Sequence, residues 1–456
     1  MNRIKTGLVR SSEPCRGLRR WWVASVAALL TPGALAQCLP NEVFGPPNTM
    51  PTGSLPLGVT TGDVNNDGFP DLATADFFGN TVTLRLGNGD GTFQGPLPII
   101  MVEPGNPDVV GPVTPAIGDV NGDGWNDIVI GVNAQIGVLL NNGAGGFQGP
   151  PLFNFAFGNQ IRGVVLAHMN QDAFLDIVFS SREDNLINVS LGNGDGTFQS
   201  QIPMFLTGGP VGAVVADFNR DGFLDVAAPL VFSSEVVVGL GDGTGALAEL
   251  GRFPADSPEG LEIGDANGDG FEDLLTPYLN GNAVQVLLGN GNGTFQPYIN
   301  IPTGADTLPI AVAFADVNAD GFDDVLAGLF LPSTVAVHLS NGEGTFQPAA
   351  PFPVGQRPRR FAMADLNGDG AVDLTAANGV SDGTVTVLLG QCLPTPDCPG
   401  DVDGSGAVDL TDLAILLAHF GTPSGATFAD GDLDGDGDVE LSDLAALLSS
   451  FGTVCP

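Results

Sequence analysis

The chain repeats one acidic loop seven times at a nearly constant spacing. The loop has the pattern D-x-N-x-D-G-x-x-D, as in DVNGDGWND at 119–127, and its copies begin at residues 63, 119, 168, 217, 265, 316 and 365. The intervals of 48 to 56 residues fit one small sheet of about four strands rather than a helical repeat. This spacing predicts a chain built from seven copies of one β-unit.

Each unit contains short, β-branched segments bounded by turn residues, which is typical of strands. In the first unit these are the strand before the acidic loop, DLATADF (71–77), TVTLRLG (81–87) and TFQGPLPII (92–100). A glycine-rich turn, LGNGDGTFQ at 86–94, recurs at 191–199 and in related form in other units. Four strands per unit and seven units predict an all-β, seven-bladed β-propeller, because radial closure removes free sheet edges. An open β-solenoid is the alternative.

The two ends of the repeat region supply a further prediction. NEVFGPPNTM (41–50) resembles the last strand of a unit, whereas the seventh unit stops at VLLGQC (387–392) without such a strand. We therefore expect the N-terminal segment to complete the last blade.

Cysteines bracket the same joint. After Cys15, which lies in the first 36 residues, the chain holds Cys38, Cys392, Cys398 and Cys455. An even number in an exported protein favours disulfides, and three pairings are possible. Because QCLP occurs at both 37–40 and 391–394, we favour Cys38–Cys392 and Cys398–Cys455.

Residues 1–36 have the pattern of an export signal: a basic start, the apolar run WWVASVAALL and an A-x-A cleavage site. They hold six of the 14 basic and one of the 52 acidic residues. The remaining strongly acidic surface argues against nucleic acid and anionic membranes as partners and favours bound cations. No later apolar run would span a membrane, so we expect a secreted or cell-surface bacterial protein, exported by the Sec or the twin-arginine route.

The acidic loops point to calcium. They are not EF-hands, because an EF-hand needs an acid at position 12 and Ile130, in the loop that begins at Asp119, lies in an expected strand. Side-chain oxygens recur instead at positions 1, 3, 5 and 9, and hard oxygens without histidine or thiol select calcium. The candidate ligands are Asp63, Asn65, Asp67, Asp71, Asp119, Asn121, Asp123, Asp127, Asp217, Asn219, Asp221, Asp225, Asp265, Asn267, Asp269, Asp273, Asp316, Asn318, Asp320, Asp324, Asp365, Asn367, Asp369 and Asp373.

The loop spacing resembles the FG-GAP/VCBS-type repeats of integrin α-subunit propellers and of many bacterial surface proteins, over about 55–392. The resemblance implies about one calcium ion in each of the six intact loops. The third loop, HMNQDAFLD (168–176), departs from the pattern at His168 and Ala173. We interpret it as metal-free, with a weak calcium site or a transition-metal site through His168 as alternatives.

The last 60 residues contain a second kind of loop. DVDGSGAVDLTD (401–412) and DLDGDGDVELSD (432–443) do carry an acid at position 12, and a helical pattern of leucines follows each. This tandem resembles a dockerin, a small all-α, EF-hand-like domain, which implies about two further calcium ions. The candidate ligands are Asp401, Asp403, Ser405, Asp409, Asp412, Asp432, Asp434, Asp436, Glu440 and Asp443.

The dockerin resemblance also implies a cohesin-like partner, contacted through Leu410, Thr411, Leu441 and Ser442. Type I dockerins of cellulosomes often carry a basic pair later in the helix, where this chain has Ala418 and His419. A calcium-clasped tail without a cohesin is therefore the alternative.

We predict an export signal at 1–36, a propeller at 37–392, a linker at 393–397 and a dockerin-like domain at 398–456. The propeller would bind a glycan or an extracellular protein, in recognition or adhesion. The candidate ligand-binding residues are Arg357, Arg359 and Arg360, expected at the blade end opposite the acidic loops. No catalytic residues stand out, so an enzyme is less favoured. A carbohydrate-active enzyme on the same scaffold and a structural matrix component remain the competing interpretations.

Overall fold

The computed structural model describes residues 40–100, 111–132, 134–143, 145–148, 152–156, 160–392, 400, 402, 408, 410–422, 431–433 and 438–452. The predicted export signal at 1–36 and the predicted linker at 393–397 lie outside these residues.

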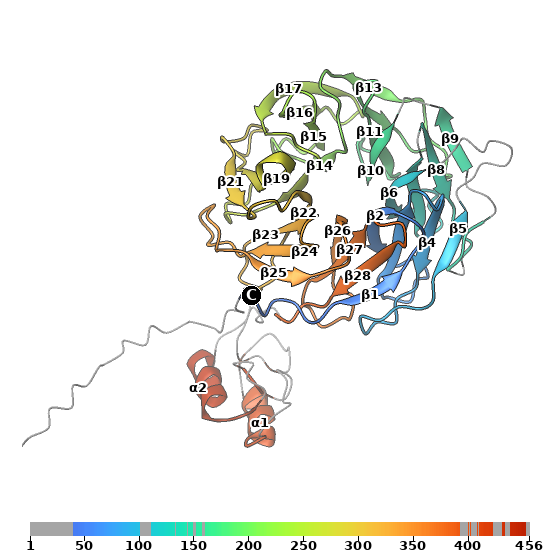
Figure 1. Ribbon diagram of the computed structural model, residues 1–456. Coiled ribbons are helices and arrows are strands. Elements are labelled where there is room, and N and C mark those ends of the chain that lie inside the picture. The colour runs from blue at the N-terminus through green and yellow to red at the C-terminus, as the bar shows by residue number, and fades with distance from the viewer. Residues whose placement is uncertain are drawn as a thin grey trace, which may run out of the picture. The chain divides into compact units, whose positions relative to one another are not determined.

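Seven four-stranded antiparallel sheets form a ring of blades (Figure 1). This confirms the seven-bladed β-propeller. Blades 1 to 7, in that order, consist of β2 (Pro56–Gly62), β3 (Asp71–Asp76), β4 (Thr81–Arg85) and β5 (Leu97–Ile100); β6 (Pro112–Gly118), β7 (Asp127–Val132), β8 (Gln135–Leu139) and β9 (Leu152–Ala156); β10 (Ile161–Ala167), β11 (Asp176–Ser181), β12 (Leu186–Ser190) and β13 (Ile202–Phe205); β14 (Val214–Ala216), β15 (Asp225–Leu230), β16 (Glu235–Gly241) and β17 (Leu247–Pro254); β18 (Glu262–Gly264), β19 (Asp273–Tyr278), β20 (Ala283–Leu287) and β21 (Ile299–Pro302); β22 (Pro309–Ala315), β23 (Asp324–Leu329), β24 (Thr334–His338) and β25 (Ala350–Pro353); β26 (Pro358–Ala364), β27 (Asp373–Asn378), β28 (Thr384–Leu388) and β1 (Asn48–Pro51).

The core lies between the blades. All six residues of β3 are buried, and so are all six of β7, because their sheets are covered on both faces. Each pair of neighbouring blades encloses its own apolar cluster, and Val59, Leu72, Ala377 and Val385 form the one between blades 7 and 1. Small and β-branched side chains therefore fill seven interfaces instead of one central core.

The ring closes as the sequence predicts. Strand β1 pairs antiparallel with β28, with Asn48 opposite Val387 and Pro51 opposite Thr384. The N-terminal segment thus supplies the fourth strand of blade 7, which rules out the open solenoid.

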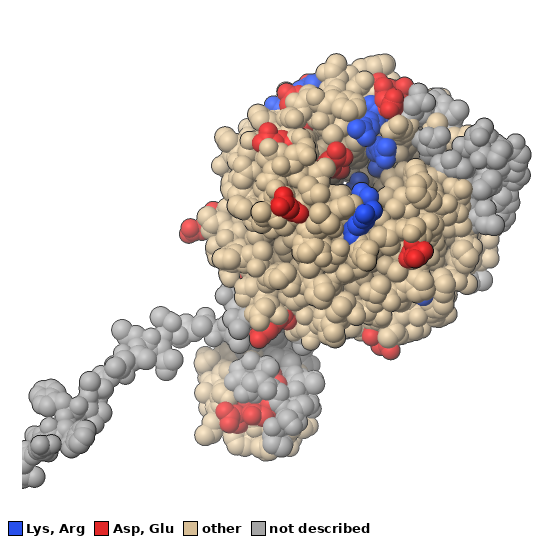
Figure 2. All heavy atoms as spheres, in the orientation of Figure 1, with Lys and Arg blue, Asp and Glu red and all other residues tan. Residues whose placement is uncertain are grey.

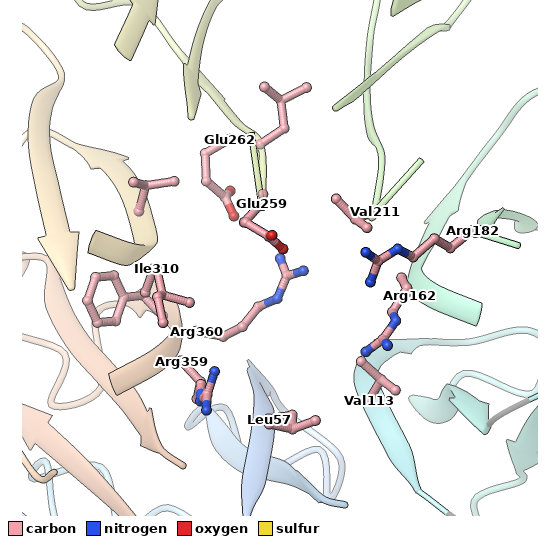
Figure 3. Close-up of a pocket in the computed structure, with 15 residues that line it drawn as sticks. Leu57, Val113, Arg162, Arg182, Val211, Glu259, Glu262, Ile310, Arg359 and Arg360 are labelled. Atoms are coloured by element: carbon pink, nitrogen blue, oxygen red, sulfur yellow. The ribbon is translucent and has the colours of Figure 1, made fainter. Parts of the chain in front are cut away.

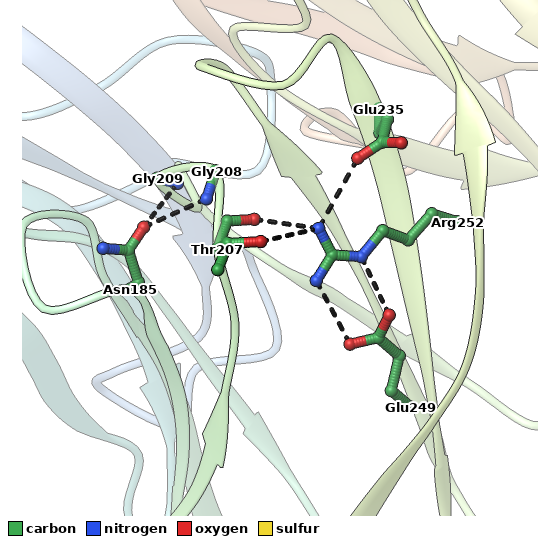
Figure 4. A network of polar contacts seen from close by, with 7 residues as sticks. All are labelled: Asn185, Thr207, Gly208, Gly209, Glu235, Glu249 and Arg252. Atoms are coloured by element: carbon green, nitrogen blue, oxygen red, sulfur yellow. Dashed lines mark hydrogen bonds and ion pairs between the residues drawn. The ribbon is translucent and has the colours of Figure 1, made fainter.

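Polar side chains fasten neighbouring blades at their crossovers (Figure 4). Asn185 has a left-handed backbone with φ of 57°, which asparagine tolerates. Its Oδ1 accepts hydrogen bonds from the amides of Gly208 and Gly209. Arg252 of blade 4 donates to the carbonyl and hydroxyl oxygens of Thr207 and pairs with Glu249 at 2.8 Å. These contacts hold the connection between blades 3 and 4.

Two helices, α1 (Leu410–His419) and α2 (Leu441–Ser450), come after the two C-terminal loops. Their positions match the leucine periodicity of the sequence and confirm the small helical domain. No helix of the described residues is long and apolar enough to cross a membrane.

The two loop–helix units of this domain exchange equivalent hydrogen bonds. The amide of Gly421 after α1 donates to the carbonyl of Val439 before α2 at 2.7 Å, and Gly452 after α2 donates to Val408 before α1 at 2.8 Å. Gly421 and Gly452 are equivalent residues of the two sequence repeats, and so are Val408 and Val439. The two bonds are therefore equivalent, and the domain has an internal twofold arrangement. Its buried core consists of Val402, Val408, Leu416, Val439 and Leu447.

Candidate functional site

Each acidic loop leaves the end of a first strand, and in five of the seven blades the side-chain oxygens of positions 1 and 3 gather around one backbone amide. In blade 1, Asp63 and Asn65 both accept from the amide of Asp67, at 3.2 and 3.0 Å. Asp67 in turn accepts from the amide of Phe69 at 3.0 Å and from the side-chain amide of Asn65 at 2.8 Å. Oxygens from positions 1, 3 and 5 therefore share one small volume.

The same convergence recurs in other blades. The amide of the fifth loop residue donates to both oxygens in the loops that begin at Asp119, Asp217, Asp265 and Asp316, at 2.9 to 3.2 Å. In blade 7, Asn367 accepts from Asp369 at 3.1 Å, while Asp365 accepts from Gly368 and Gly370. The six intact loops thus share one hydrogen-bonded form, with a small variation in blade 7.

The aspartate at position 9 has a structural role that the sequence did not reveal. It is the first residue of the second strand in every blade, and its exposed fraction is 0% in all seven. In blade 1, Asp71 accepts from the amide of Val64 in the loop and from the amide of Gly87 in the glycine-rich turn, both at 2.8 Å. One buried carboxylate therefore ties the acidic loop to the turn beside it.

These buried aspartates are electrostatically unfavourable without a cation. Burial raises their pKa, to about 6 in Asp127, Asp225 and Asp373, to about 7 in Asp273 and to about 8 in Asp324. Amide hydrogen bonds oppose the rise, and the carboxylates at loop positions 1 and 5 add to it. A cation among the loop oxygens would remove that repulsion.

The loops fit a hard cation by the chemistry of their donors. Asp225 Oδ2 is buried and lacks the short amide bond that the equivalent oxygen of Asp71 accepts from Val64, which leaves a carboxylate oxygen for a metal ion in the loop of blade 4. Among the described residues, no three Asp, Glu, His or Cys side chains cluster closely enough to hold a metal by themselves. The asparagine at position 3 and backbone carbonyls would therefore have to complete a calcium shell of six to eight oxygens.

The third loop differs at its first residue. His168 Nδ1 is hydrogen-bonded to the carbonyl of Phe174 at 2.9 Å, so one ring nitrogen is occupied within the loop itself. Asn170 and Asp172 keep the bonds of the intact loops, with Asn170 Oδ1 accepting from the amide of Asp172 at 2.9 Å. The loop keeps its shape but lacks the carboxylate of position 1.

In the helical domain two of the predicted acidic ligands lie at the helix starts, whereas Asp432 is buried at the first position of the second loop and Glu440 is exposed just before α2. Asp443 is fully buried in the first turn of α2 and accepts from the amides of Leu433 and Glu440, both at 2.7 Å. Asp412 is also fully buried, at the equivalent place in α1. The other predicted ligands Asp401, Asp403, Ser405, Asp409, Asp434 and Asp436 lie outside the described residues.

The four predicted docking residues, Leu410, Thr411, Leu441 and Ser442, are all exposed. The leucines are 73% and 72% exposed. Further exposed apolar side chains extend this surface at equivalent places on both helices: Leu417 and Phe420 on and after α1, and Leu448 and Phe451 on and after α2.

A cavity of about 170 Å³ lies in the propeller where the first strands begin (Figure 3). It opens at the middle of the face shown in Figure 2, where basic side chains gather. The residue six places before each acidic loop contributes to its lining in all seven blades: Leu57, Val113, Arg162, Val211, Glu259, Ile310 and Arg359. We call this cavity the channel mouth.

The structure brings only part of the predicted arginine cluster to the channel mouth. Arg359 and Arg360 line it, whereas Arg357 lines a separate hollow and lies over the ring of Phe330, 4.9 Å from its centroid. Sequence reasoning missed four charged residues that share the channel mouth: Arg162, Arg182, Glu259 and Glu262. Alignment of the seven units on their acidic loops would have placed Arg162, Glu259 and Arg359 at one register.

β-Bulges lie at several of the residues six places before the acidic loops, which line the channel mouth. The pairing of first and second strands is interrupted at Leu57, at Arg162, at Ile310 and at Arg359, each the residue six places before its loop. A bulge bends the strand and redirects a side chain, which turns this position toward the central channel.

Cys392 is buried beside Val43 and Phe44 in the core between blades 6 and 7, and it is not a free thiol. The other cysteines, Cys15, Cys38, Cys398 and Cys455, lie outside the described residues. Both disulfide pairings therefore stay predictions.

Comparison with known proteins identifies both parts of the chain. Residues 63–130, 119–179, 168–228 and 265–327 match the FG-GAP-like repeat and together span just over half of the chain. Residues 399–450 match the Dockerin type I domain. No match is found among curated proteins.

Solved structures match about three quarters of the chain at low identity. BBS1N in complex with ARL6DN, soaked with mercury, is 12% identical with a TM-score of 0.54, covering 77% of this chain and 99% of that one. An Agrocybe aegerita lectin, described as recognising non-reducing terminal N-acetylglucosamine, is 20% identical with a TM-score of 0.49, covering 74% and 86%. A catalytically inactive virginiamycin B lyase from Staphylococcus aureus with quinupristin is 13% identical with a TM-score of 0.48, covering 75% and 99%.

The likeness to BBS1N shows a shared fold and nothing about function. The repeat matches, together with seven blades that each carry the acidic loop or its altered third copy, define the larger part of the chain. The chain belongs to the FG-GAP-like repeat family and carries a Dockerin type I domain.

Proposed function

We propose that this protein is an extracellular, calcium-stabilised propeller that binds a glycan or protein ligand and is attached to a cohesin-type partner through its dockerin. Dockerin domains bind cohesins, and dockerin-bearing proteins are typically extracellular or at the cell surface. The observation that carries the attachment is the duplicated exposed surface of α1 and α2, with Leu410 and Leu441 each more than 70% exposed. Large apolar side chains repeated on a small domain mark a protein-binding surface.

The attachment is tested by capture on an immobilised type I cohesin in calcium. Because the surface is present twice, we expect each single variant, Leu410→Asp or Leu441→Asp, still to bind the cohesin. The double variant should lose binding by 100-fold or more. Phe78→Asp is the matched control, because Phe78 is 67% exposed on the propeller. Capture of the double variant at wild-type strength would contradict the proposal, and no capture of the wild type would favour the tail without a cohesin.

The calcium part rests on the donor chemistry of the loops and on the family. Dockerin type I domains bind calcium, and FG-GAP repeats often do. We expect about six ions in the propeller and two in the dockerin. Asp63, Asn65, Asp67 and Asp71 would hold one of them, as would their equivalents in the other intact loops. Chelation should lower the melting temperature, because an ion bound only to the folded state stabilises it by mass action. An unchanged melt in EDTA would refute this part.

The ligand-binding part is supported by the channel mouth, which collects charged side chains from blades 3, 5 and 7. The mature chain would be tested in calcium against plant, algal and mucin polysaccharides, with retention and release of soluble sugar recorded together. Retention without product is the expected result. Release of product would favour the competing enzyme, and absence of both would favour a structural matrix component.

A further inference from the structure

The channel mouth concentrates the scarce positive charge of this chain. Beyond residue 36 the chain holds eight arginines and no lysine. Four of the eight line this one cavity: Arg162, Arg182, Arg359 and Arg360 (Figure 3). In a chain with a formal net charge of −38, half of these eight arginines therefore share one cavity, and an anion bound there would balance their charge.

The arginines of the channel mouth keep unused donors. The ion pairs among the described residues are those of Arg252 with Glu235 and Glu249, on β16 and β17 of blade 4. The Nε atoms of Arg162, Arg182 and Arg359 are buried and have no hydrogen-bond partner. Leaving such donors unsatisfied is costly, and burial also lowers the pKa of Arg162 and Arg359. An anion in the cavity would meet these guanidinium groups through their other N–H groups and would stabilise their charge.

Two of the charged residues are exceptions to the repeat. Arg360 stands five places before its acidic loop, where the other blades have Gly58, Thr114, Gly163, Gly212, Gly260 and Ala311. Glu262 stands three places before its loop, where the others have Thr60, Ala116, Val165, Val214, Ala313 and Ala362. The fold thus needs only a small or uncharged residue at these positions. Arg360 of blade 7 and Glu262 of blade 5 are the exceptions, and both line the same cavity.

The mixture of charges selects among anions. A guanidinium offers paired N–H donors that match a carboxylate. Glu259 and Glu262 line the same cavity and accept hydrogen bonds from hydroxyl groups, and the charge of Glu259 disfavours a multiply charged phosphate more than a single carboxylate. A group with one carboxylate and several hydroxyls satisfies both sets of side chains, and a sugar acid is such a group.

The size of the cavity limits how much of the ligand enters. Its volume of about 170 Å³ equals roughly six water molecules at about 30 Å³ each. That is space for one sugar-sized group and too little for an oligomer. The remainder of a longer chain would have to stay outside the opening (Figure 2).

We propose that the channel mouth binds the terminal uronate residue of an acidic saccharide, with Arg162, Arg182, Arg359 and Arg360 on its carboxylate and Glu259 and Glu262 on its hydroxyls. This rests on the proposed function, in which the propeller is the ligand-binding part, and it names the ligand class and the site.

The test is calorimetric titration of the mature chain in calcium with galacturonate and glucuronate, and with galactose and glucose as neutral counterparts. We expect binding of at least one uronate and at least 10-fold weaker binding of its neutral counterpart. Arg360→Gly and Arg162→Val, which install residues that other blades hold at these registers, should each weaken uronate binding by 10-fold or more. Arg252→Gln is the matched control that removes an arginine elsewhere, and it should bind like the wild type.

Two results would overturn the inference: equal binding of uronate and neutral sugar, or unchanged uronate affinity in folded Arg360→Gly and Arg162→Val. Thermal melts in calcium show whether each variant is folded, and the two variants test the site independently. If no sugar binds while the cohesin still captures the chain, the uronate site fails and the attachment stands.

A pH titration adds a second readout. Burial raises the pKa of Glu262 to about 7, and the charge of Arg360 partly offsets the rise. Above pH 7 Glu262 is therefore ionised and, together with Glu259, repels the carboxylate that the arginines hold, whereas below pH 7 it is protonated. If only the protonated form binds, the Kd rises up to about 10-fold between pH 6 and pH 8. Glu262→Gln should abolish this pH dependence, and an identical profile in the variant would contradict the assigned role.

Discussion

The acidic loops of the propeller and the loops of the dockerin use the same device at different positions. In both, a buried aspartate accepts the amide of the second loop residue, Val64 to Asp71 in blade 1 and Leu433 to Asp443 in the dockerin. The propeller places this aspartate at loop position 9, and the dockerin places it at position 12.

The second bond of the aspartate differs between the loop that leads into a strand and the loop that leads into a helix. In blade 1 it comes from Gly87, in a turn 16 residues away, so the aspartate joins two parts of one sheet and β3 begins. In the dockerin it comes from Glu440, three residues away, which forms a capping box at the start of α2. The amide-accepting aspartate thus begins a strand in the propeller loop and lies in the first turn of a helix in the dockerin loop, which also has an acid, Glu440, at position 9.

The largest expected effect comes from removing the buried aspartate of a blade. Asp71→Ala leaves the buried amides of Val64 and Gly87 without an acceptor, which we expect to cost roughly 1–3 kcal/mol for each amide. Urea unfolding in EDTA measures this loss apart from calcium. Asp67→Ala, in the exposed part of the same loop, is the control and should lose far less. Equal losses in both variants would show that the buried hydrogen bonds of Asp71 stabilise the loop no more than the exposed contacts of Asp67 do.

The equivalent change in the dockerin should have a smaller and local effect. Asp443→Ala removes the same two kinds of amide bond, but these amides are only partly buried, so we expect a loss of about 1–2 kcal/mol, within the range of helix caps. Helical circular dichroism and cohesin capture should report it, while the unfolding of the propeller stays unchanged. A destabilised propeller in this variant would contradict the expectation, because it would show that the propeller and the dockerin unfold together.

How far the sequence predicts this molecule depends on whether a feature is periodic. The blade count, the closing strand β1 and both helices arise from repeats of turn residues and leucines, and they are confirmed. The amide-accepting role of Asp71 was hidden, because this role and the metal ligation predicted for Asp71 both require a carboxylate. The channel mouth was hidden for another reason: Arg162, Glu259 and Arg359 are about two blades apart in sequence, and only the closed ring of blades brings them to one cavity.

The third loop tests whether its two departures from the intact pattern abolish calcium binding. Because His168 and Ala173 are its two departures from the intact pattern, the double variant His168→Asp, Ala173→Gly should bind one more calcium ion per chain than the wild type. Metal analysis after equilibrium dialysis gives the count. With free calcium tenfold above the Kd, the added ion should stabilise the chain by about 1.4 kcal/mol. Asp119→Ala should lose one ion, and an unchanged count in both variants would refute the loops as calcium sites.

The smallest expected effect separates the ion from the hydrogen bonds of the loop. Asn65 and Asn170 make the same contacts, each accepting from the amide of the fifth loop residue and donating to its carboxylate. In EDTA, Asn65→Ala and Asn170→Ala should therefore destabilise the chain alike, by no more than about 0.5 kcal/mol, as is usual for exposed positions. In calcium only Asn65→Ala should lose more, because only its loop carries the aspartate of position 1. Urea unfolding of both variants in each condition measures the difference. A calcium-dependent loss in Asn170→Ala as well would show that the third loop binds the ion without that aspartate. An aspartate at position 1 would then not distinguish the blades that bind calcium from the third blade.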